Sequence, residues 1–137
     1  MEQPTTAQLL QAWKQLPESI RYQPATQPQI DAFESQHGPI PPTYREFLLQ
    51  FGGGAVGSEW LDGVDQLANT HAKFRRERSL HAWRLDDAFV IGWDGAGNPL
   101  AISREGAVVV EDHNFGGVHR LASSLMAYVA RGLGHAL

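Results

Sequence analysis

The stretch Trp93-Asp94-Gly95-Ala96-Gly97-Asn98-Pro99 separates two apolar runs, residues 88–93 and 100–103. Glycine adopts the positive φ that tight loops need, and the Asp and Asn side chains can bond to the nearby backbone. Proline is tolerated at the first residue of a strand. A third strand-like run, residues 107–112, follows after only three residues. The stretch therefore predicts an antiparallel meander over residues 88–112. Its first and third strands are almost continuously apolar, which predicts that both are central and covered on two faces.

Helical patterns flank this meander on both sides. Residues 42–51 carry apolar side chains at i, i+3, i+4 and i+7, begin with proline and end at Gly52-Gly53-Gly54. Similar reasoning predicts helices over residues 5–16, 28–38, 62–78 and 123–131, a connector over 18–27 and a strand over 56–61. Helices, then a meander, then a closing helix is an α+β order. We expect a central, mostly antiparallel sheet flanked by helices.

Length and composition predict a single domain spanning residues 1–137. Its 42% hydrophobic content is enough for a buried core. The absence of cysteine excludes disulfides, thiolate zinc sites and cysteine nucleophiles. The N-terminus has no signal-peptide pattern, and no apolar run approaches the length of a membrane span. These features predict a cytoplasmic protein that does not bind a membrane.

The charge distribution favours a protein partner over a nucleic acid. The net charge is −4, and residues 86–112 contain six acidic residues and one basic residue. A nucleic-acid footprint normally has the opposite bias. The short basic window at residues 73–78 is explained by cations at the end of a helix. We therefore expect any charged partner to be basic.

Three motifs suggest a cofactor or metal site, but the sequence around each of them does not fit such a site. Gly52, Gly54 and Gly57 match G-x-G-x-x-G, but a predicted helix precedes them where a dinucleotide site needs a strand. The Asp94 loop has Ala96 and Pro99 where a calcium loop needs an oxygen ligand and a glycine. No histidine pair has i, i+4 spacing. The sequence therefore predicts no cofactor, no metal and no catalytic residue.

Trp60 and Trp93 are the candidate binding residues of greatest interest, because each has acidic neighbours. Each indole alone is best explained by core packing with a polar tip. As a pair rimmed by carboxylates, they would also suit a protein-binding hot spot. The predicted partner-binding residues are Glu59, Trp60, Asp62, Asp86, Asp87, Trp93, Asp94, Glu111, Asp112 and Asn114.

Several of these motifs together resemble the SUKH superfamily, within it the Smi/Knr family named after a fungal cell-wall assembly regulator. The match begins at Ile30-Asp31-Ala32-Phe33-Glu34 and Gly38 and continues through the helix at 42–51 with its glycines. It then includes Ile91-Gly92-Trp93-Asp94-Gly95, Gly97-Asn98-Pro99-Leu100, Gly106, Val108, Asp112-His113 and the helix after Leu121-Ala122-Ser123-Ser124. It covers about residues 28–131, which leaves the helix at 5–16 as an extension.

The resemblance implies a central sheet flanked by helices and no chemistry of its own. Bacterial members are regarded as immunity proteins that neutralise a toxin, and fungal members as regulatory modules. The first hypothesis is thus a monomeric or weakly dimeric cytosolic binder of a cognate toxin. The second is a regulatory module that recruits a cellular protein. The third is a hydrolase in which His113 and two carboxylates converge.

Overall fold

Local capping residues set where the first two long helices begin. In the computed structural model, which describes residues 4–81, 83–85, 87–114 and 116–134, Thr5 and Gln8 form a reciprocal capping box at the start of α1. Thr26 and Gln29 do the same for α2. Each box satisfies backbone N–H groups that the first helical turn leaves without partners. Gly38, with φ of 94°, ends α2.

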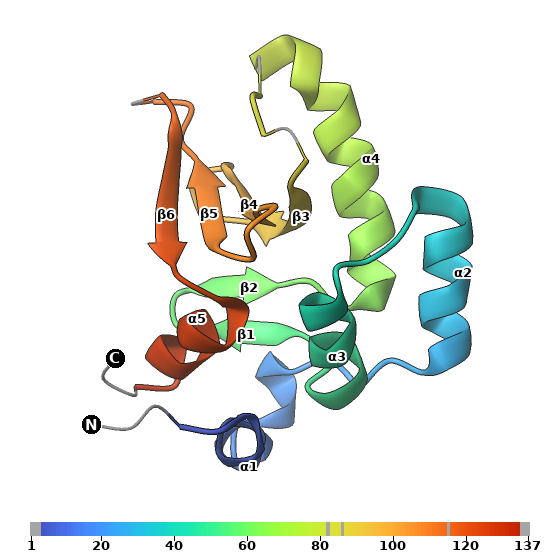
Figure 1. Cartoon of the computed structure of the whole chain (residues 1–137), viewed down its shortest axis with the longest axis vertical. Coiled ribbons are helices and arrows are strands. Elements are labelled where there is room, and N and C mark those ends of the chain that lie inside the picture. Colours follow the sequence, from blue (N-terminus) through green and yellow to red (C-terminus); the bar gives the residue numbers. More distant parts are fainter. Residues whose placement is uncertain (1–3, 82, 86, 115, 135–137) are drawn as a thin grey trace.

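The element order is helices first, then strands, then a closing helix (Figure 1). The helices are α1 (Thr6–Lys14), α2 (Gln27–His37), α3 (Pro42–Gln50), α4 (Val64–His81) and α5 (Leu125–Gly132), with a 3-10 turn at Glu18–Ile20. The strands are β1 (Gly54–Val56), β2 (Glu59–Leu61), β3 (Phe89–Trp93), β4 (Pro99–Ile102), β5 (Val108–Glu111) and β6 (Val118–Ala122). The α+β prediction is confirmed.

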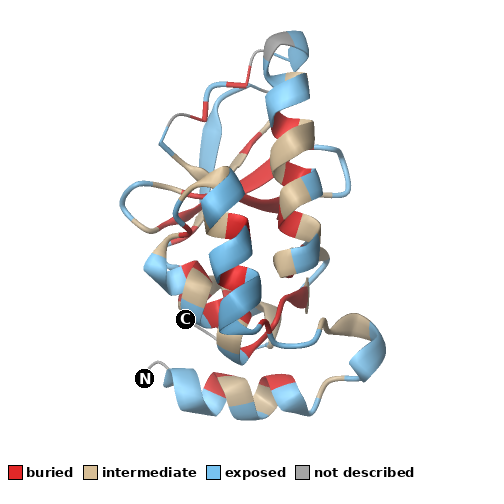
Figure 2. Ribbon diagram, turned by 90° about the vertical axis from the view of Figure 1, so that its right-hand side faces the viewer, coloured by how far each residue is buried: buried red, intermediate tan, exposed pale blue. Residues whose placement is uncertain are grey.

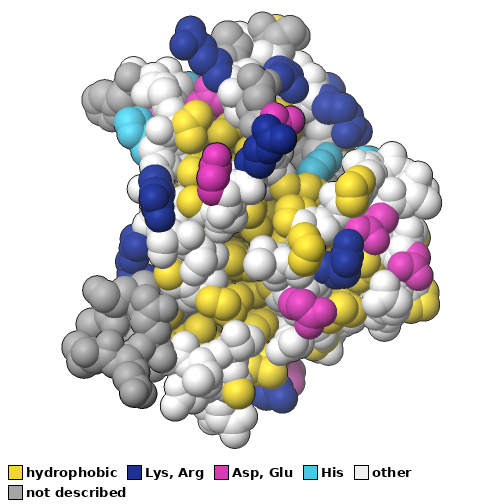
Figure 3. Space-filling view, viewed as in Figure 1, with side chains coloured by type: hydrophobic (Ala, Val, Ile, Leu, Met, Phe, Trp, Pro, Cys, Tyr) yellow, Lys and Arg dark blue, Asp and Glu magenta, His cyan; other side chains and the backbone are white. Residues whose placement is uncertain are grey.

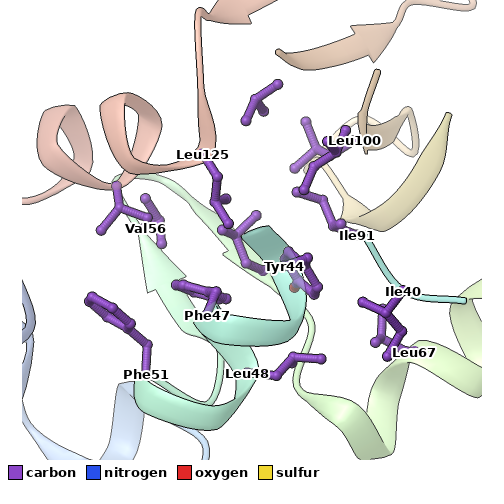
Figure 4. Packing of buried hydrophobic residues seen from close by; sticks show 14 of the residues in the cluster. Ile40, Tyr44, Phe47, Leu48, Phe51, Val56, Leu67, Ile91, Leu100 and Leu125 are labelled. Atoms are coloured by element: carbon purple, nitrogen blue, oxygen red, sulfur yellow. The ribbon is translucent and has the colours of Figure 1, made fainter. Parts of the chain in front are cut away.

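The strands form two antiparallel sheets. β1 pairs with β2, and the larger sheet has the order β3-β4-β5-β6. Side chains alternate across a strand, so each face of the larger sheet carries its own set. Ile91, Leu100 and Val108 face the main core, where they meet Tyr44, Phe47 and Leu48 of α3 and Phe51 directly after it (Figure 4).

The opposite face of the larger sheet is covered by a second, smaller cluster. Val90, Ala101 and Val109 pack there against Trp83 and Leu85. Phe74 of α4 joins them from the side. In Figure 2 the helices towards the viewer bury one side and expose the other, as amphipathic helices on a core do. Strands β3, β4 and β5 are therefore covered on both faces, whereas β6 is largely exposed.

Three local predictions need correction. The predicted strand over 56–61 is a hairpin, because Gly57 and Ser58 form a turn between β1 and β2. β3 lies at the edge of the larger sheet, so of the two strands predicted to be central only β5 is. The connector over 18–27 contains a 3-10 turn, and its Arg21 bridges to Gly54 of β1. β6 was not predicted.

Candidate protein-binding surface

The end of β2 lies against β3, which brings several predicted partner-binding residues together. The Asp62 N–H donates to the Ile91 carbonyl over 2.8 Å. A Cβ at Gly92 would lie 2.7 Å from the Trp60 carbonyl oxygen, so only glycine allows the strands this close. This approach places Glu59 next to the β3–β4 loop and the Trp60 backbone against Gly92.

Trp60 is the exposed aromatic of this region. Its side chain is 40% exposed, and its ring lies 5.6 Å from that of Tyr22 in a tilted arrangement. A large, rigid and partly exposed aromatic pair is typical of the centre of a protein interface. Tyr22 lies in the segment that sequence predicted only as a connector. No pattern in the sequence links it to a residue 38 positions away.

Asp62 supports the interior of this region instead of forming its rim. The Thr70 hydroxyl donates to its carboxylate, and the Tyr44 hydroxyl donates to its backbone carbonyl over 2.5 Å. Burial raises the pKa of Asp62 to about 6, although the bond from Thr70 opposes that shift. The residue therefore ties α3 and α4 to the end of β2.

Trp93 packs within the second hydrophobic cluster. Its ring lies 6.5 Å from that of Trp83 and 6.4 Å from that of Phe74. The Lys73 ammonium sits 4.2 Å above its centroid, which is a cation–π geometry. The core-packing explanation fits Trp93 better than an exposed anchor does.

The Asp94 carboxylate shapes the β3–β4 loop. It accepts hydrogen bonds from the Ala96 and Asn98 amides at 2.9 and 2.8 Å and from the Asn98 side chain at 3.1 Å. Glu59 accepts from the Gly95 amide at 3.0 Å, which fastens the loop to β2. Both acids remain partly exposed while they do this. The predicted hairpin loop is confirmed.

Asn98 extends this network to the β5–β6 loop. It is 2% exposed, and its side-chain oxygen accepts from the His113 amide at 3.0 Å and lies 2.5 Å from the His113 ring Nδ1. In the same loop Asp112 accepts from the Asn114 amide at 2.7 Å. Asp94, Asp112 and Asn114 therefore lie at one end of the larger sheet.

The structure places Glu111 in the interior, contrary to its predicted position on a docking rim. Glu111 is only 5% exposed. Both carboxylate oxygens accept from the Arg84 amide, at 2.7 and 2.8 Å, and one also accepts from the Leu85 amide at 3.0 Å. Glu111 holds residues 83–85 over the sheet.

Asp87 lies away from the other predicted residues. It is exposed, pairs with Arg104 at 3.7 Å and faces the β4–β5 turn at the opposite end of the larger sheet. Asp86 lies outside the described residues. The acidic run in the sequence thus does not become one acidic face, and Figure 3 shows Lys and Arg side chains alongside acidic ones on the side it presents.

Tyr128 and Arg131 of α5 are neighbours of this surface that the sequence did not indicate. Burial raises the pKa of the Tyr128 phenol, and the Glu59 and Asp94 charges raise it further. Tyr128 and Arg131 line a shallow pocket with Ser58 of the β1–β2 turn. The contact depends on how α5 packs on β1, which no local pattern encodes.

The hydrolase hypothesis finds no support in the described part of the chain. His113 is bonded to Asn98, and the nearby Glu111 carboxylate is occupied by the backbone of residues 84 and 85. Among residues 4–81, 83–85, 87–114 and 116–134, no three His, Asp or Glu side chains gather as metal ligands. No helix there is long and apolar enough to cross a membrane.

The SMI1 / KNR4 family (SUKH-1) matches residues 24–131. A search of curated proteins found no match.

Proposed function

The chain belongs to the SMI1 / KNR4 family (SUKH-1), and from this premise we propose that it is a non-catalytic protein-binding domain that neutralises a cognate toxin. In this proposal the chain acts in the cytoplasm of the cell that it protects. It works by direct binding, so it needs no cofactor and changes no bond in the toxin. The observation that carries the proposal is the family match over residues 24–131.

We place the docking core at Trp60 and Tyr22. Exposed aromatic pairs bury much apolar area at little entropic cost, which is why they dominate interface energies. Glu59 and Asp94 are partly exposed beside this core and would form its rim. Glu59 and Trp60 point to opposite sides of β2, so the partner must reach around that strand.

The partner is proposed to be basic. The net charge of −4 favours approach of a cationic surface, and the rim carboxylates would add to this attraction. Of the other predicted contacts, Asp112 and Asn114 lie near Asp94 and extend the rim, whereas Asp87 lies at the far end of the sheet. Asp62 and Glu111 act through the folded structure and make no direct contact.

The test is co-expression with the toxin domain encoded beside the chain's own gene. We expect the chain to restore growth and to co-purify with the toxin in a complex that weakens as salt rises. The intact mass of the toxin recovered from that complex should be unchanged. A covalent change in the toxin would contradict a non-catalytic role. If the chain neither restores growth nor forms a complex with the toxin, the regulatory hypothesis is favoured.

A further inference from the structure

An apolar groove lies between α3 and α5, on the face shown in Figures 1 and 3. Its volume is about 380 Å³. Hydrophobic side chains gather between these two helices in Figure 3. The lining residues are Pro42, Phe47, Phe51, Leu125, Met126 and Gly106, with Thr6, Thr43, Glu46, Gln50 and Ser124 around them.

The floor of the groove is the surface of the main core. Phe47 of α3, Phe51 directly after α3 and Leu125 of α5 belong to that core and are at most 2% exposed (Figure 4). Met126 forms a wall and is only partly buried. Gly106, in the β4–β5 turn, would carry a Cβ with no atom within 4 Å, so the groove is open on that side. A rigid apolar floor with an open mouth suits an inserted side chain.

Glu46 is the charged residue that lines this groove. It is exposed, and the Gln50 side-chain amide donates to its carboxylate at 3.0 Å, which holds the charge at the mouth. The groove also meets the first turns of α1 and α5. One first-turn amide of each helix, that of Gln8 or Ala127, donates to the side chain of the capping Thr5 or Ser124. An incoming group therefore meets the negative charge of the Glu46 carboxylate.

We propose that this groove receives one large apolar side chain of the partner protein, with an adjacent Lys or Arg paired to Glu46. The volume is at the small end of the range for ligand pockets, roughly 300–1,000 Å³, which suits a single anchor residue better than a long segment. Charge complementarity selects a basic neighbour over an acidic one. The proposal rests on the proposed function in taking the occupant to be a protein.

The experiment selects random twelve-residue displayed peptides on the intact chain and on two charge-reversed variants. Glu46→Lys changes the groove, and Glu18→Lys changes an exposed acid of the 3-10 turn as a matched control. We expect peptides selected on the unchanged chain to share an apolar residue next to Lys or Arg. Glu46→Lys should weaken these peptides about fivefold to tenfold and select acidic neighbours instead, whereas Glu18→Lys should change neither.

Occupancy of the groove is read from Met126. The chain has two methionines, Met1 and Met126, so ¹³C-methyl labelling of methionine gives a simple spectrum in which the Met126 signal reports on the groove wall. Selected peptides should shift that signal saturably. No enriched peptide, peptides that leave Met126 unmoved, or the same preference on Glu46→Lys would overturn the proposal.

The peptide and toxin experiments distinguish failure of the groove proposal from failure of the proposed function. Peptides that bind the groove while the toxin does not bind the chain would contradict only the proposed function. A tight toxin complex that leaves Met126 unmoved and tolerates Glu46→Lys would contradict only the groove.

Discussion

At the scale of single residues, burial determines the structural role and the pKa of the Asp62 carboxylate. In the sequence it follows an apolar run and resembles a surface acid or a helix cap. In the fold it accepts from Thr70 and its own carbonyl accepts from Tyr44. Its pKa of about 6 means that the folded state binds a proton more tightly than the unfolded chain does.

This shift predicts a pH effect whose direction is fixed. Since the folded pKa lies above the ordinary carboxyl value of 3.8, ionised Asp62 destabilises the fold above pH 6, and that penalty disappears as pH falls towards 4. In Asp62→Asn the penalty is absent at every pH. The free energy of unfolding of the variant minus that of the parent should therefore be larger at pH 7.5 than at pH 4, by roughly 1–3 kcal/mol. Urea unfolding at both values measures it.

The difference between Asp62→Asn and the parent removes the pH effects of titrating groups that both proteins share. Burial lowers the pKa of His71, so His71 stabilises the fold above its unfolded pKa and that contribution is lost as pH falls. Its effect opposes that of Asp62, but it is present in both proteins and cancels from the difference. A difference in unfolding free energy that is the same at both pH values would contradict the account of Asp62.

Gly92 and Gly95 are close in sequence, but we expect a side chain to be tolerated at Gly95 and not at Gly92. A Cβ at Gly92 would lie 2.7 Å from the Trp60 carbonyl oxygen, whereas one at Gly95 would have no atom within 4 Å. We expect Gly92→Ala to lower the free energy of unfolding by roughly 2 kcal/mol or more. Gly95→Ala should change it by less than about 1 kcal/mol. Equal losses in chemical denaturation would show that β2 does not approach β3 this closely.

Residue patterns predicted loops better than they predicted contacts. Asp94, Asn98 and Pro99 indicated the hairpin loop, because the side-chain bonds that shape it are local. The bond between Asn98 and His113 joins two loops 15 residues apart, so it depends on strand pairing that no short motif encodes.

At the scale of elements, residues 83–85 behave as a strap across the second face of the larger sheet. Trp83 and Leu85 bury their side chains on Val90 and Val109. Glu111 of β5 fixes the strap by accepting three backbone hydrogen bonds from Arg84 and Leu85. A buried carboxylate with this many donors is structural, which explains why an acid stands in an apolar strand.

Removing that carboxylate should loosen the strap. In Glu111→Ala the Arg84 and Leu85 amides lose their acceptor, and the free energy of unfolding should fall by roughly 2–4 kcal/mol. Exchange of those two amide protons should accelerate in the same variant. Glu105→Ala, which removes an exposed acid from the β4–β5 turn, should change stability by less than about 0.5 kcal/mol. A Glu111→Ala protein as stable as the Glu105→Ala control would refute the strap.

The sequence predicted most helices and the three meander strands because their apolar spacing is regular. It did not predict β6, which follows Gly116-Gly117 and exposes Val118, His119 and Arg120. An edge strand with little burial carries little hydrophobic pattern. It also merged β1 and β2, because a two-residue turn between three-residue strands leaves no room for periodicity.

At the scale of the whole molecule, charge in the sequence and charge on the surface differ. The acids of residues 87–112 are distributed between the interior, the loops and a pair with Arg104. Composition therefore led to the prediction of a basic partner and could not locate a docking face. Trp60 and Tyr22 become candidates only once β2, β3 and the connector are assembled.

The central claim is that a partner toxin docks on Trp60. Its most direct test is calorimetric titration of the cognate toxin, identified by rescue in co-expression and catalytically inactivated, into the parent chain, Trp60→Ala and Leu80→Ala. Leu80 is 79% exposed on α4 and so controls for the loss of a surface apolar group. The account predicts that Trp60→Ala weakens binding by about 30-fold or more, as loss of a hot-spot residue does, and that Leu80→Ala changes it by less than about threefold. A Trp60→Ala protein that is folded and binds the toxin as tightly as the parent would contradict it.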